Sequence, residues 1–397
     1  MTRPFRRLVL YLPGFDPFPP RRYRELFRRE SEDQARISGY ALRMAGQPAA
    51  GRFGWAASAD FPDGPAETRF EVLPWADLVQ ASMVAGIPGT YRQLLQTAWA
   101  YIASGALFRL IRLRRGPVLA ALYPIVVLIL QLLAGLLLGW LAGWLLAPLS
   151  GLAWLGWLVA VAICGATLWA FRSQDHRIFA YYLMHDYAFT AKLNGAYPPE
   201  LEQKITEFVT RIRTALREDV DEVLIVGHSS GAYIAVSALA DLLRDEPLPA
   251  GAPVLSLLTL GHVVPMAAFL PKAQRLRADL AWLSECADLF WLDVTAPGDA
   301  CSFALCDPVA VTGVAGPDQR WPLVISAAYR QTLSAERQRA LRGHWFKLHF
   351  QYLCAFDRPG DYDYFAITCG PKTLSQRFGH RSHSPGRITT PAGPGLP

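Results

Sequence analysis

A serine flanked by glycines is the residue of this chain best placed to do chemistry. It lies in the pentapeptide Gly227-His228-Ser229-Ser230-Gly231, which fits the pattern G-x-S-x-G. A continuous apolar run at 223–226 precedes it, and a segment with helical periodicity at 231–243 follows. A serine on a tight turn between a buried strand and a helix projects its hydroxyl above the sheet edge, where the helix N-terminus adds oriented N–H groups. The pattern therefore predicts Ser229 as a nucleophile. The alternative, a phosphate-binding or structural glycine turn, lacks the lysine of a P-loop and a G-x-G-x-x-G.

The segment 224–240, LIVGHSSGAYIAVSALA, resembles the nucleophile elbow of the α/β-hydrolase superfamily, which includes lipases, esterases and thioesterases. The resemblance covers residues 5–110 and 175–370. It implies an oxyanion hole made by the N–H of Ser230 and by an N–H of Gly14 or Phe15, in the loop after an early strand. Pro13 stands where relatives have the histidine of a His-Gly dipeptide. The resemblance also implies a catalytic triad in the order serine, acid, histidine.

Two aspartates are the main candidates for the acid of such a triad. Residues 289–294 have the composition of a strand; Asp293 lies near its end and Asp299 on the loop beyond. A loop residue can reach over the sheet edge, whereas a side chain within a strand is confined to one face. We therefore expect Asp299 as the acid, with Asp293 as the alternative and Asp307 as a third candidate.

Two histidines downstream of the acid could serve as the base. His344 and His349 are five residues apart, so on a helix they point about 140° away from each other and only one can face the site. His349 has apolar and aromatic neighbours, whereas His344 lies beside an arginine and a glycine. We expect His349 as the base and keep His344 as the alternative.

The order of the remaining segments predicts an α/β fold. Strand-like runs occur at 7–12, 37–44, 53–59, 70–74, 254–260, 289–294 and 323–326, and helical periodicity at 91–113, 199–217, 273–286 and 335–355. Such alternation predicts an α/β-hydrolase-like, mostly parallel sheet with helices on both faces. Residues 1–115 and 172–374 would form the two parts of the hydrolase domain, and the Pro-, Gly- and Arg-rich residues 375–397 a disordered tail.

An inserted hairpin interrupts this domain. Residues 116–171 contain no Asp, Glu, Lys, Arg or His, and the segment 147–151 with its proline and glycine divides them into two transmembrane spans, 118–146 and 152–171. Arginines flank both outer ends and the turn is uncharged, which places the catalytic domain and both termini on the cytoplasmic side of an inner (plasma) membrane.

Glycines recur every four residues in the first span, at Gly135, Gly139 and Gly143. Small residues at this spacing let two helices approach closely. The glycine face would pack either against the second span of the same chain, which we favour, or against a second chain in a homodimer.

The composition narrows the classes of partner and cofactor. The net charge of +6 is not accompanied by a nucleic-acid-binding motif, so we expect no nucleic acid and attribute the arginine clusters to anionic lipid. The six cysteines are scattered and no metal-binding spacing occurs, so no metal or cofactor is expected. The sequence predicts a membrane-anchored serine hydrolase that cleaves an acyl ester or thioester. The alternative is a catalytically silent, membrane-tethered interaction protein with the same fold.

Overall fold

The strand that leads to Ser229 lies inside an eight-stranded sheet. In the computed structural model, which describes residues 3–46, 53–150 and 152–396, β5 (Glu222–His228) pairs in parallel with β1 (Phe5–Leu12) on one side. On its other side it pairs in parallel with β6 (Val254–Leu260). Every residue of β5 is buried, as its continuous apolar run predicts for a strand covered on both faces.

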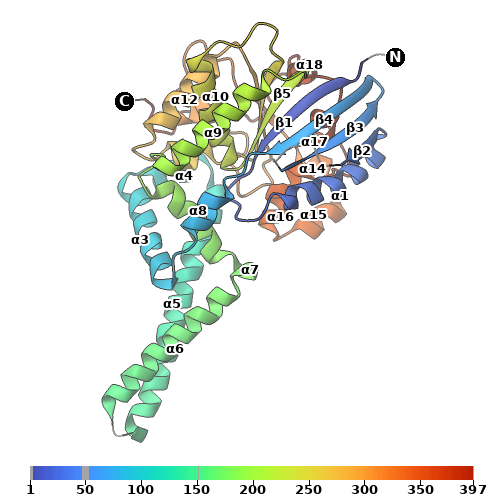
Figure 1. The fold of residues 1–397 in the computed structure, drawn as a ribbon. Helices are drawn as coiled ribbons and strands as arrows, with labels where there is room; N and C mark the ends of the chain where they lie inside the picture. Colours follow the sequence, from blue (N-terminus) through green and yellow to red (C-terminus); the bar gives the residue numbers. More distant parts are fainter. Residues whose placement is uncertain (1–2, 47–52, 151, 397) are drawn as a thin grey trace.

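Most of the remaining strands continue the parallel arrangement. The order across the sheet is β2-β3-β4-β1-β5-β6-β7-β8, of which Figure 1 labels the strands from β2 to β5. β7 (Phe290–Thr295), β8 (Leu323–Ser326) and β4 (Gly64–Val72) are parallel to their inner neighbours, whereas β3 (Gly54–Phe61) and β2 (Ala41–Ala45) pair antiparallel. The prediction of an α/β fold with a mostly parallel sheet is confirmed. Because β1 and β5 are neighbours, the segments before and after the hairpin form one sheet.

Alternate side chains of β1 enter two different cores, one on each face of the sheet. Leu8 and Leu10 belong to one core, and Val9 and Tyr11 to the other, because successive side chains of a strand point to opposite faces. The helices that supply the first core are α9 (Pro199–Ala215), α10 (Gly231–Asp245) and α12 (Gln274–Glu285). Those that supply the second are α1 (Arg21–Ser38), η1 (Phe350–Leu353), α17 (Tyr364–Cys369) and α18 (Leu374–Phe378).

Helix α1 is a departure from the predicted pattern. Residues 37–38 end this helix instead of starting a strand, and the strand expected at 37–44 is β2, which begins at Ala41. Charged residues dominate α1, but its buried positions, which include Tyr23, Phe27 and Ala35, recur at helical spacing. These buried positions form a stripe too narrow to be recognised in the sequence among the charged residues of the helix.

Two predicted single helices are broken at glycines. The helix expected at 91–113 consists of α3 (Ile87–Ala103) and α4 (Ala106–Leu113), bent by 75° at Gly105, which has a φ of +73°. The helix expected at 335–355 is divided into α15 (Ala335–Leu341), α16 (Trp345–His349) and η1, with Gly343 at φ +78°. In both cases glycine adopts the left-handed conformation that ends a helix. The other short helices are α2 (Ala76–Ser82), α7 (Asp175–Ile178), α8 (Ala180–Ala191), α11 (Val264–Ala268), α13 (Pro308–Thr312) and α14 (Tyr329–Thr332).

The apolar block forms a helical hairpin that extends away from the sheet (Figure 1). Its helices are α5 (Arg115–Ser150) and α6 (Ala153–Ser173). Both are long and apolar enough to cross a membrane, and the described residues hold a third such unit only if the bent pair α3–α4 counts as one span. The expected turn at 147–151 differs from the structure, because residues 147–150 continue α5, and residue 151 lies outside the described residues.

The glycine face of α5 packs against α6 of the same chain. A Cβ atom on Gly139 would lie 2.3 Å from the carbonyl oxygen of Ala160, and one on Gly143 would lie 2.5 Å from that of Gly156. The two backbones therefore approach too closely for any larger residue. The packing within the chain that we favoured is present in the structure, and the homodimer stays a prediction.

The segment expected to be a disordered tail is instead packed on the domain. Residues 374–378 form α18, and Ile388 bridges to Cys306. The N–H of Ser384 donates to the carbonyl of Val324 in the edge strand β8. These main-chain hydrogen bonds hold the segment on the domain, although its polar composition predicts disorder.

Candidate active site

The turn after β5 holds Ser229 in a conformation that few residues adopt. Its φ is +58°, in the left-handed region that is costly for a residue with a side chain and that occurs often at functional sites. The N–H of Ser229 donates to the carbonyl of Leu260 in the neighbouring strand (2.9 Å), and its carbonyl accepts from Ala232 (3.1 Å). These two hydrogen bonds fix the turn between sheet and helix.

The glycines on either side are required by close backbone contacts. A Cβ on Gly231 would lie 2.3 Å from the carbonyl oxygen of Leu12, and one on Gly227 would lie 2.7 Å from that of Gly231. The G-x-S-x-G spacing thus lets the nucleophile turn pack directly against the end of β1. This contact brings the loop after β1 to Ser229.

That loop is the one expected to complete an oxyanion hole. Gly14 lies against the serine, since a Cβ on it would be 2.9 Å from Ser229 Cβ and 3.4 Å from Ser229 Oγ. Trp75 Nε1 donates to the carbonyl of Pro13 (2.8 Å), and the Tyr182 hydroxyl donates to the carbonyl of Phe15. Both bonds orient the peptide planes of the loop, because a peptide is rigid.

Among the residues that the structure describes, three N–H groups of this region have no protein acceptor. Within the described part of the chain, the main-chain hydrogen bonds do not use the N–H of Gly14, Phe15 or Ser230. Ser230 is also the residue at the N-cap of α10, where the helix dipole favours negative charge. The arrangement can therefore donate hydrogen bonds to an oxyanion formed beside Ser229.

The expected acid and base are hydrogen-bonded to each other. His349 Nδ1 and Asp299 Oδ2 are 2.7 Å apart, and both side chains are buried. Asp299 also accepts from the Tyr352 hydroxyl (3.0 Å) and from the N–H of Cys301 (2.9 Å). Burial raises the pKa of the Asp299 carboxyl, but the charge and hydrogen bond of His349, together with the other donors, lower the pKa below its usual value. An ionised Asp299 holds the proton of His349 on Nδ1 and leaves Nε2 free to accept one.

His228, the residue before Ser229, packs against His349. Its Nε2 lies 3.1 Å from the carbonyl oxygen of His349, and the two rings are 4.8 Å apart. Burial, and then the charge of His349, lower the pKa of His228 to about 3. His228 is therefore neutral and packs under His349 without competing for its proton.

The alternative acids are occupied elsewhere. Asp293 is fully buried in β7, where it accepts from the Thr259 hydroxyl at 2.6 Å, and burial raises its pKa to about 6. Asp307 caps α13 by accepting from the N–H groups of Val309 and Ala310. The structure thus brings only Asp299, of the three aspartates considered, to the base.

The alternative base, His344, is exposed at the start of α16. Its Nδ1 lies 3.2 Å from the carbonyl oxygen of Arg342. His349, at the other end of this short helix, is buried and shares a cavity with Ser229. No hydrogen bond joins Ser229 Oγ to His349 among the described residues; in substrate-free sites this bond is often long and tightens when substrate binds.

A cavity of about 610 Å³ surrounds these groups, within the usual range for small-molecule sites. One wall is a face of α8, a helix that the sequence pattern did not reveal as part of the site. The residues of that face recur at helical spacing and are Tyr182, Leu183, Asp186, Tyr187 and Thr190. The polar residues at 182, 186 and 190, four apart in the sequence, were the signal that could have indicated this face of the helix.

Asp186 is an additional carboxyl inside this cavity. Burial raises its pKa to about 7, while the charge of His349 acts in the opposite direction. The described part of the chain supplies no hydrogen-bonded or ion-paired partner for its side chain. A carboxyl in this position changes its charge near neutral pH.

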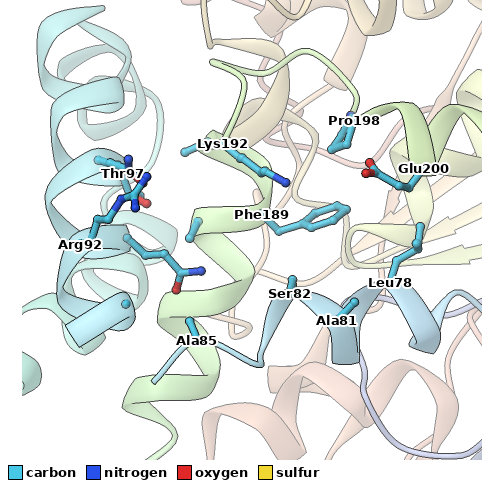
Figure 2. Close-up of a pocket in the computed structure, with 15 residues that line it drawn as sticks. Leu78, Ala81, Ser82, Ala85, Arg92, Thr97, Phe189, Lys192, Pro198 and Glu200 are labelled. Atoms are coloured by element: carbon cyan, nitrogen blue, oxygen red, sulfur yellow. The ribbon is translucent and has the colours of Figure 1, made fainter. Parts of the chain in front are cut away.

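The opposite face of α8 borders a second cavity of about 470 Å³ (Figure 2). Phe189 points into this cavity, and its ring also lies 5.9 Å from that of Phe15 and 5.7 Å from that of Trp75. The oxyanion loop is thus packed against a helix that has a cavity on each side.

One group of side chains in the described residues has the spacing of a metal site: Asp299, Cys301 and His349, whose ligand atoms lie within 4.8 Å of one another. Burial raises the pKa of the Cys301 thiol well above its usual value, which disfavours the thiolate that binds metals. In addition, the ligand atoms of Asp299 and His349 are hydrogen-bonded to each other. The geometry fits an acid–base pair better than a ligand set.

Comparisons of the chain with protein-family models, with curated proteins and with solved structures found no match. A function for the chain is therefore inferred from its own fold and site.

Proposed function

We propose that this protein is a membrane-anchored serine hydrolase of the α/β-hydrolase superfamily that cleaves an acyl ester or thioester, with its catalytic domain on the cytoplasmic side. The observation that carries the proposal is the buried 2.7 Å contact between Asp299 and His349, because His349 lines the same cavity as Ser229. Three separate segments supply a serine in the left-handed region, a histidine that lines the same cavity, and a carboxylate hydrogen-bonded to that histidine.

In the proposed reaction, Ser229 Oγ attacks the acyl carbonyl carbon and forms a C–O bond, while its proton passes to His349 Nε2. Asp299 stabilises the imidazolium that results. The N–H groups of Ser230 and of the Gly14–Phe15 loop stabilise the negative oxygen. The bond to the leaving alcohol or thiol then breaks, and this group takes the proton from His349.

Water completes the turnover in the second half of the reaction. His349 takes a proton from the water, whose oxygen attacks the acyl carbon, and returns the proton to Ser229 Oγ as the ester bond breaks. The products are a carboxylic acid and the free enzyme. No cofactor takes part in these steps.

A fluorophosphonate probe, which reacts with activated serines, tests the proposal. We expect full-length protein in detergent to be labelled, Ser229→Ala to lose the label, and Ser58→Ala, at an exposed position of β3, to keep it. Well-folded wild-type protein that takes no label would contradict the proposal and favour the catalytically silent interaction protein.

A further inference from the structure

The cavity around Ser229 is bordered in part by the ends of the two hairpin helices. Pro117 belongs to the first turn of α5, while Asp175, His176 and Phe179 follow closely after the end of α6 at Ser173. One cavity therefore extends from the nucleophile to the place where the hairpin leaves the domain.

The length of α6 locates this place relative to a membrane. Its 21 residues correspond to about 31 Å of helix, close to the hydrocarbon thickness of a bilayer, which is about 30 Å. If α6 spans the bilayer, its end at Ser173 lies at the boundary between hydrocarbon and headgroups. Asp175 and His176, which line the cavity, follow Ser173 after one intervening residue and so lie close to that boundary.

The helix that carries His349 contacts the same region. In α16, the ring of Trp345 lies 5.7 Å from that of Tyr123 in α5, and the ring of Phe346 lies 4.9 Å from that of Phe179. The Tyr123 hydroxyl donates to the carbonyl of Ile178 (2.8 Å). The short helix that ends at His349 thus packs against α5 and against the segment that follows α6.

Besides Asp175 and His176, this end of the cavity is lined by apolar side chains. Phe179, Leu183 and Phe346 line it, and Phe18 at the rim is 53% exposed. Arg22 lies over the rings of Phe18 and of Phe350, which also line the cavity, at 5.3 and 4.6 Å, and its charge is paired with Asp16 at 3.1 Å. An apolar cavity that borders the residues just after a membrane-length helix matches an acyl lipid better than a water-soluble ester.

We infer that the site takes its substrate directly from the cytoplasmic leaflet. The substrate is a membrane-resident acyl ester whose chain occupies the apolar mouth while its carbonyl reaches Ser229. This inference rests on the proposed serine hydrolase function and adds the substrate class and its route.

The test uses full-length protein reconstituted in phosphatidylcholine vesicles. Two fluorogenic esters are compared, 4-methylumbelliferyl palmitate dissolved in the bilayer and 4-methylumbelliferyl acetate in the water. We expect wild-type protein to favour the palmitate. Phe18→Asp, which places a charge in the mouth, should lower the palmitate-to-acetate rate ratio by about tenfold through loss of one aromatic contact. Phe108→Asp, at an exposed phenylalanine of α4 outside the cavity lining, is the matched control and should leave the ratio within about twofold.

The possible results separate this inference from the function on which it rests. Wild-type protein that takes the fluorophosphonate label and cleaves acetate, but does not favour palmitate, overturns the membrane route and leaves the hydrolase standing. The same holds if Phe18→Asp and Phe108→Asp change the ratio equally. Wild-type protein without label or turnover overturns both.

Discussion

Asp299 and Asp293 form a matched pair for testing the acid of the proposed triad. Both are buried, and each accepts a short hydrogen bond, Asp299 from His349 (2.7 Å) and Asp293 from Thr259 (2.6 Å). Replacement by asparagine keeps the size of either side chain and removes its charge. Only Asp299→Asn removes a charge next to the base.

The expected size of the effect follows from the Asp299–His349 contact. Two unit charges 2.7 Å apart attract by about 6 kcal/mol at an effective dielectric constant of about 20. This attraction is gained when His349 accepts the proton of Ser229, so its loss raises the barrier by a similar amount. Since about 1.4 kcal/mol changes a rate tenfold, we expect a loss of about 10⁴-fold, the size seen when an asparagine fixes the wrong histidine tautomer.

The assay is the second-order rate of inactivation by a fluorophosphonate, which needs no knowledge of the substrate. Asp299→Asn should lower this rate by about 10³-fold or more, and Asp293→Asn should change it by about threefold or less, equivalent to about 0.7 kcal/mol. Asp293 accepts from Thr259 and Asp299 from His349, so replacing Asp293 leaves the acid–base contact in place. A folded Asp299→Asn protein within tenfold of wild type, or an equal loss in Asp293→Asn, would refute the assignment.

Three further predictions concern charge and packing. Burial raises the pKa of Asp186 to about 7 in the folded protein, above its ordinary 3.8. Ionisation of Asp186 therefore destabilises the fold as the pH rises from about 4 to about 7. Asp186→Asn should raise Tm at pH 8, and this gain in Tm should shrink towards pH 5. Glu222→Gln leaves the buried Arg7, with which Glu222 pairs at 2.6 Å, without a counter-charge, and should lower the free energy of unfolding in denaturant by about 3–5 kcal/mol. Asp219→Asn, which removes a charge from an exposed pair, should lower it by less than about 1 kcal/mol. Gly139→Leu, whose Cβ would lie 2.3 Å from a facing carbonyl, should lower Tm in detergent, while Gly165→Leu, with open space around its Cβ, should not; equal Tm values would contradict the hairpin packing.

Local sequence was sufficient for the elements whose pattern has a single explanation. The 56 residues 116–171 without a charge could only be apolar helices, and α5 and α6 follow. The run 223–226 could only be a strand covered on both faces, as β5 is. Glycines at fixed spacing around Ser229 encode a close approach of backbones, which the contacts of Gly227 and Gly231 show.

Elements whose pattern is ambiguous were decided by their neighbours. The charged helix α1 and the packed segment after residue 374 are held by contacts with distant parts of the chain, and composition alone carries no sign of these partners. The same is true of the breaks at Gly105 and Gly343, because a glycine in a helical pattern can be either tolerated or used as a cap.

By itself, the sequence determined the Gly227–Gly231 turn, the candidates for acid and base, and the apolar hairpin, because each depends on residue types within a few positions. Only the tertiary structure decided between Asp299 and Asp293, since the choice depends on which carboxylate lies within hydrogen-bond distance of His349, fifty residues away along the chain. It also brought α8 into the site, with Tyr182 bonded to the oxyanion loop and Asp186 in the cavity. A cavity is made by surfaces that meet from separate segments, and no local pattern records where they meet.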